Sequence, residues 1–146
     1  MLKRVLFAGL IVVAFAPFVQ ARDVGTTLKI EDVVNSADYK EKVGNDIAFY
    51  FGDKPTPRVA QNFGEYITNK KTNAFGKSDE RACSWVMISA LLQLRDRAVR
   101  EGGNAVIKVV SYYNKQEIPD KTEYECHTGA FVAGVALKGT VVKLSK

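Results

Sequence analysis

The cysteine pair constrains the fold of this chain more than any other feature. Cys83 and Cys126 are the two cysteines of the 146-residue sequence. Cys83 falls in a segment with helical periodicity, and Cys126 falls in a segment that alternates as a strand does. A disulfide between them would pin a helix to a sheet. In the chain-entropy model, closing this loop stabilises the fold by at most about 4 kcal/mol.

Residues 1–21 predict that the chain enters an oxidising compartment. The positive pair Lys3-Arg4 precedes an apolar stretch from Val5 to Phe15, and Val19-Gln20-Ala21 fits a small-residue cleavage site. A membrane anchor is the alternative reading, but it needs roughly 20 uninterrupted apolar residues, more than this stretch offers. We therefore expect a signal peptide cleaved after Ala21 and a periplasmic product. Two lone cysteines there most simply form one disulfide.

Residues 22–146 are enough for one domain with its own hydrophobic core. The loss of Lys3-Arg4 with the signal would lower the formal net charge from +5 to +3. A nucleic-acid-binding protein more often carries a concentrated basic face, so we expect no nucleic-acid partner. We also expect no transmembrane segment after cleavage.

The clearest predicted element is a long helix. Ser78 is a good N-cap, Asp79 and Glu80 favour the positive end of the helix dipole, and Gly102-Gly103 ends the pattern. One apolar stripe along this segment predicts a buried face. The stripe consists of Cys83, Met87, Leu91, Leu94 and Ala98.

The remaining pattern predicts strands around this helix. We expect short helical turns within Leu28–Val43, an extended segment from Arg58 that gives way to a polar loop at Thr68–Asn73, and a turn at Ala133-Gly134. The predicted strands are Ile47–Phe51, Asn104–Tyr113, Glu123–Val132 and Val135–Leu144. The fold class is therefore α+β, a small and largely antiparallel sheet with the long helix packed on one face, in a single domain.

His127 is the single histidine and limits the possible chemistry. A zinc site with Cys126 is one alternative, but neighbouring strand residues point to opposite faces and a closed zinc site needs four ligands. Nucleophilic catalysis would need a thiol or hydroxyl activated by His127. Neither a Gly-x-Ser-x-Gly elbow nor a Gly-x-x-x-x-Gly-Lys-Ser/Thr phosphate loop is present. We assign no catalytic, cofactor or metal residue, and expect a protein that is not an enzyme.

A basic and aromatic region is the candidate partner surface. It could hold an anionic polymer, lipid head groups or an acidic partner, whereas a solvated loop is the simpler interpretation. Trp85, at the edge of the helix stripe, could anchor a partner. The candidate residues are Tyr66, Lys70, Lys71, Phe75 and Trp85.

Residues 81–144, about half of the mature chain, resemble the periplasmic domain of the lipoprotein that senses envelope stress for the Rcs phosphorelay, and more distantly the YbjQ-type domains. Ala82-Cys83, the run Gly103–Ile107, and Cys126 eleven residues before Leu137 carry this resemblance. It implies that Cys83 and Cys126 form a disulfide. The second disulfide and the lipidated N-terminal cysteine of that sensor have no counterpart here.

The whole chain is also similar to small exported bacterial proteins labelled as excinuclease ATPase subunits. The missing phosphate loop and the export signal both argue against that activity. The sequence therefore predicts a periplasmic binding or sensing module that contacts an envelope protein. A periplasmic protein that binds a small ligand or a metal remains the alternative, because YbjQ-like relatives are described as putative metal binders.

Overall fold

The long helix predicted after Ser78 is α3 (Asp79–Glu101) of the computed structural model, which describes residues 12–17 and 22–146. Ser78 caps it, because its Oγ accepts a hydrogen bond from the Arg81 amide at 3.2 Å. Gly102 ends it in the left-handed region at φ 81°, which favours glycine. Every residue of the predicted stripe is buried. The helix and its buried face are therefore confirmed.

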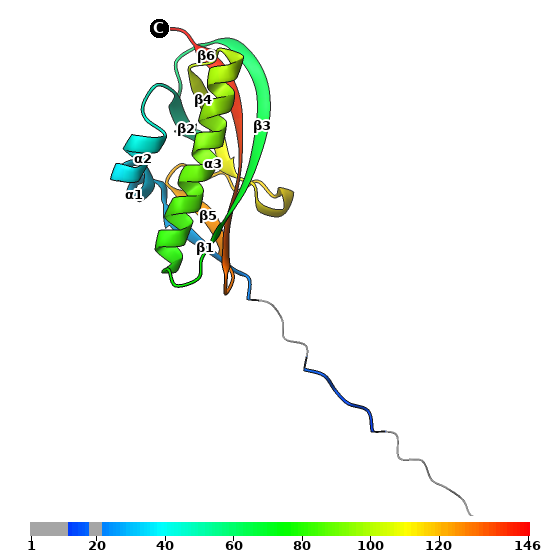
Figure 1. The fold of residues 1–146 in the computed structure, drawn as a ribbon. Helices are drawn as coiled ribbons and strands as arrows, with labels where there is room; N and C mark the ends of the chain where they lie inside the picture. The colour runs from blue at the N-terminus through cyan, green and yellow to red at the C-terminus, as the bar shows by residue number, and fades with distance from the viewer. Residues whose placement is uncertain (1–11, 18–21) are drawn as a thin grey trace, which may run out of the picture.

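Six strands form one curled sheet that runs behind α3 (Figure 1). β6 is its centre: β3 pairs with one edge of it, and β5 and β4 pair with the other. β1 extends the sheet beyond β5, and β2 extends it beyond β4. The pair β2–β4 is parallel and all other pairs are antiparallel. The strands are β1 (Val24–Lys29), β2 (Ala48–Phe51), β3 (Val59–Asn73), β4 (Ala105–Ser111), β5 (Glu123–Thr128) and β6 (Val132–Leu144).

Two short helices, α1 (Ile30–Val34) and α2 (Ala37–Lys42), follow β1 and lie beside α3 (Figure 1). Ser36 caps α2 by accepting a hydrogen bond from the Tyr39 amide at 3.2 Å. A 3₁₀ turn, η1 (Tyr113–Lys115), follows β4. These elements confirm the α+β class, with one long helix against a mostly antiparallel sheet in a single domain.

The main core lies between the helices and the sheet, and a smaller cluster covers the opposite face. β4 contributes to both, because Val106 and Val109 face the helices while Ala105 and Ile107 face the smaller cluster. β4, within the predicted strand Asn104–Tyr113, is therefore buried on both faces. Among the described residues, no helix combines the length and apolarity needed to cross a membrane.

Two predictions about the strands are wrong. Thr68–Asn73 is not a loop, because each of its residues pairs with β6, from Thr68↔Leu137 to Asn73↔Val132. Strand β5 ends at Thr128, and the turn to β6 is closed by the Gly129 amide, which donates to the Val132 carbonyl at 2.7 Å. The predicted turn at Ala133-Gly134 instead lies within β6. At Thr68–Asn73 and at Ala133-Gly134, backbone pairing between β3 and β6 determines the structure, and the local residue types do not.

The predicted signal peptide falls mainly on residues 1–11 and 18–21, which lie outside the described residues. Residues 12–17 form no helix or strand and lie away from the domain (Figure 1).

The structure places Cys83 and Cys126 in a disulfide between α3 and β5, with their Cα atoms 5.9 Å apart. β5 pairs with β6 only through His127↔Gly134 and Thr128↔Ala133. β1 in turn pairs with β5, over six residues from Val24 to Lys29. The β1–β5 ribbon therefore joins the rest of the sheet through a short ladder, and the disulfide is its covalent attachment to the helix.

Reduction of this disulfide, or the double substitution Cys83→Ala/Cys126→Ala, should lower the free energy of unfolding by about 2–4 kcal/mol and leave the domain folded. Because the ribbon has few other attachments, its amides should lose hydrogen-exchange protection before those of β3, β4 and β6. Urea unfolding and hydrogen exchange of oxidised and reduced protein measure the two effects. An equal loss of protection across all six strands would contradict the inference that the β1–β5 ribbon depends on the disulfide more than the other strands do.

Candidate functional site

His127 lies in a cluster that the sequence does not bring together. Its Nδ1 is 2.9 Å from Asp23 Oδ1, and its Nε2 is hydrogen-bonded to Glu125. The ring of Tyr113 stacks on the imidazole, with centroids 3.5 Å apart and planes 9° from parallel. Gly25 lies against the ring, where a Cβ would be 3.0 Å from His127 Cε1. The imidazole is thus held between an aromatic ring and the β1 backbone.

The two carboxylates determine the charge of this histidine. Burial by itself lowers the pKa of His127, but the hydrogen bonds and charges of Glu125 and Asp23 outweigh it, so the net pKa is raised. When the imidazole is protonated, both ring nitrogens donate to a carboxylate. Burial, reinforced by the charge of Asp23, raises the pKa of Tyr113, so its phenol stays neutral.

The structure determines which groups of His127 and Cys126 already have partners. Both ring nitrogens are engaged by carboxylates, and His127 and Cys126 occupy opposite faces of β5, as the sequence predicts. Cys126 is bonded to Cys83 and offers no thiolate. Within the described ranges, no group of three or more histidine, cysteine, aspartate or glutamate side chains is placed to hold a metal ion.

The candidate partner residues are distributed along α3. Tyr66 lies at its last turn, where its hydroxyl donates to Glu101 at 3.2 Å and the Arg97 guanidinium stands 4.4 Å from its ring centroid. Trp85 lies on the side of α2, with the Lys42 ammonium 5.1 Å from its ring centroid. Lys70 lines a groove between β3 and α3.

Phe75 and Lys71 lie near the start of α3, at the opposite end of the helix from Tyr66. Phe75 belongs there to an exposed aromatic pair. The ring of Phe75 stacks on that of Phe131, with centroids 5.8 Å apart. Phe75 is 69% exposed and Phe131 is 63% exposed. Backbone pairing holds them together, because the Ala74 amide donates to the Phe131 carbonyl at 2.8 Å. We call Phe75, Phe131 and Val132 the aromatic tip.

The aromatic tip is set in a polar and basic surrounding. Lys71, Thr72 and Asn73 line the hollow beside it, and the Lys77 ammonium is bound to the Asn73 carbonyl at 2.9 Å. The tip lies where the β5–β6 turn reaches the start of α3 (Figure 1). Phe131 is not among the predicted partner residues, because it falls in the predicted strand Glu123–Val132 and only the fold places it beside Phe75.

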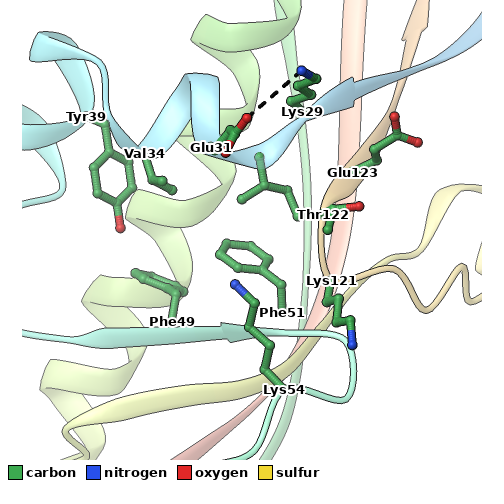
Figure 2. A pocket seen from close by; sticks show the side chains of 11 residues that line it. Lys29, Glu31, Val34, Tyr39, Phe49, Phe51, Lys54, Lys121, Thr122 and Glu123 are labelled. Carbon is green, nitrogen blue, oxygen red and sulfur yellow. Dashed lines mark ion pairs between the residues drawn. The ribbon is translucent and has the colours of Figure 1, made fainter.

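A second hollow, of about 430 Å³, opens between the short helices and β2. Figure 2 shows Tyr39 and Val34 on one side, Phe49 and Phe51 on the other, and the amine of Lys54 extending toward the two phenylalanine rings. We call it the lysine pocket. The sequence carries no local signal for it, because its residues come from β1, α1, α2, β2 and the approach to β5.

Comparison of the chain with protein-family models, with curated proteins and with solved structures gave no match.

The raised pKa of His127 makes a pH dependence of stability testable. A histidine with a raised folded-state pKa contributes stability that is fully present below its ordinary value of about 6.5 and is lost as pH rises through the raised pKa. The free energy of unfolding should therefore fall as the pH rises above about 6.5 in the wild-type protein, and fall less in His127→Gln. Urea unfolding at several pH values measures the difference between the two proteins.

An NMR titration of the single imidazole provides the independent check on this pH dependence. The titration midpoint should lie above about 6.5, and Glu125→Gln should lower it. A midpoint at or below the ordinary value would show that burial outweighs the two carboxylates.

Proposed function

We propose that this protein is an exported binding module of the bacterial cell envelope that acts through contact with another protein. The aromatic tip is the observation that carries the proposal. Large aromatic side chains that stack on each other and remain mostly exposed are typical of contact anchors. The protein partner would cover Phe75 and Phe131, and the lysines around them would favour an acidic rim on that partner.

Export is proposed on the predicted signal peptide, which the cysteine pair supports, since a single disulfide suits a periplasmic protein. The resemblance of residues 81–144 to the Rcs stress-sensor domain stays a prediction, and it agrees with a role in the envelope. A role without catalysis is supported by two features. His127 has both ring nitrogens engaged by carboxylates, and both cysteines are in the disulfide.

The aromatic tip should be required for partner capture. Site-specific photo-crosslinking from position 77, beside the tip, should capture an envelope protein in the periplasm, and Phe75→Ala/Phe131→Ala should reduce the yield about tenfold or more, because stacked aromatic anchors are typical binding hot spots. Ile67→Ala is the matched control, since Ile67 is 58% exposed on β3 but lies outside the tip. Comparable losses in the two variants would contradict the proposed surface.

A lipid surface is the competing partner for an aromatic and basic tip. Sedimentation with vesicles of phosphatidylglycerol and phosphatidylcholine distinguishes a lipid surface from a protein partner. Capture of a protein without vesicle binding supports the proposal, whereas vesicle binding that the double variant abolishes would replace it with a membrane contact.

A further inference from the structure

The lysine pocket has an apolar interior built by three elements. Ile30 and Phe51 are each 5% exposed and form its base, and Phe49 stacks on Phe51 with ring centroids 6.3 Å apart. Val34 of α1 and Tyr39 of α2 close the opposite side (Figure 2). Burial raises the pKa of Tyr39, so this phenol stays neutral. The volume of about 430 Å³ falls in the range of about 300–1,000 Å³ typical of small-ligand pockets.

Two lysines at the mouth of this apolar interior have no acidic partner. In residues 12–17 and 22–146, no carboxylate lies within 4.0 Å of Lys54 or Lys121. The third lysine, Lys29, is paired with Glu31 at 4.0 Å. Figure 2 shows the Lys54 amine directed toward the rings of Phe49 and Phe51, whereas the Glu123 carboxylate points away from them. An unpaired ammonium directed at an apolar surface favours an anion that brings its own apolar body.

The backbone holds the two lysines on adjacent segments. Gly52, at φ 60°, turns the chain after β2 so closely against the neighbouring loop that a Cβ would lie 3.0 Å from the Lys121 amide nitrogen. The Asp120 side chain fixes that loop, because it accepts the amide hydrogens of Thr122 at 2.8 Å and Glu123 at 3.1 Å. The Ile30 amide donates to the Thr122 carbonyl at 2.9 Å and joins the loop to α1. The mouth of the pocket is therefore tied to its base.

We propose that the lysine pocket binds small monocarboxylates with an apolar tail, such as medium-chain fatty acids. The tail lies on Phe49, Phe51 and Val34, and the carboxylate accepts a hydrogen bond from Lys54, while the positive charge of Lys121 lies at the rim. Glu31 and Glu123 at the rim disfavour ligands with several negative charges. The ligand class goes beyond the proposed protein contact, and no residue of the aromatic tip lines this pocket.

Sodium octanoate and octanol form a matched pair of probes, because they share the tail and differ in the charged group. In NMR titrations of the purified oxidised protein, octanoate should shift the amides of Phe49, Phe51 and Thr122 with a Kd of about 1 mM or tighter. Octanol should bind the same residues more weakly. Equal affinity for the two probes, or octanoate shifts confined to other residues, would overturn the proposal.

The lysine variants test the recognition of the carboxylate. Lys54→Gln should weaken octanoate binding about threefold to tenfold and change octanol binding less than twofold, because only the charged contact is removed. Lys143→Gln, which removes the same charge from an exposed position on β6 outside the pocket, should leave both affinities unchanged. An equal loss in the two variants would show attraction by net charge alone and overturn the site.

A variant that blocks the apolar interior tests whether the two probes bind in the pocket or on another apolar surface. Val34→Trp should fill the space beside Phe49 and abolish the binding of both probes, since Val34 is only partly buried and its side chain faces the pocket (Figure 2). The amide spectrum of β3 and β6 reports whether the variant is folded. Retained octanoate binding in a folded Val34→Trp protein would overturn the assignment. If that variant does not fold, the Lys54→Gln comparison decides the question.

Discussion

The bond between Cys83 and Cys126 is the constraint on which much of this structure depends. β1 and β5 form a two-stranded ribbon, and such ribbons are marginally stable without further packing. The ladder from β5 to β6 supplies only two residue pairs. The disulfide replaces the missing ladder by joining the middle of the ribbon to the buried stripe of α3. The sheet of β3, β6, β4 and β2 is thereby extended by two strands.

The His127 cluster and the lysine pocket are both built on this ribbon. Asp23 directly precedes β1 and His127 lies on β5, and their contact aligns the start of β1 with the end of β5. Lys29 and Thr122 come from its opposite end, where they form one wall of the lysine pocket. The oxidation state of the cysteines therefore bears on the electrostatic cluster and on the pocket, although neither contains a sulfur atom.

The sequence predicts most of the fold and little of the sites, and the reason is physical. Capping residues and periodicity are local, so α3, the α2 cap and the alternation of β5 follow from the residues themselves. The Asp23–His127 contact joins residues 104 positions apart, and the Phe75–Phe131 stack exists only because β3 and β6 are neighbours. Side-chain chemistry indicates which residues can interact, but the strand register decides which of them meet.

The second half of β3 is a polar and basic segment that the sequence predicts as a loop, and this composition protects the edge of the sheet. β3 pairs with β6 along one edge, and in the described structure no strand covers its other edge. A long free edge invites pairing with a second chain, and lysines with backbone bulges are the usual protection against such aggregation. β3 has both, with Lys70 and Lys71 near one end and register shifts around Ala60 and Phe63 near the other. The polar run that the sequence predicts as a loop is thus suited to limiting edge-to-edge pairing of chains before the disulfide has formed.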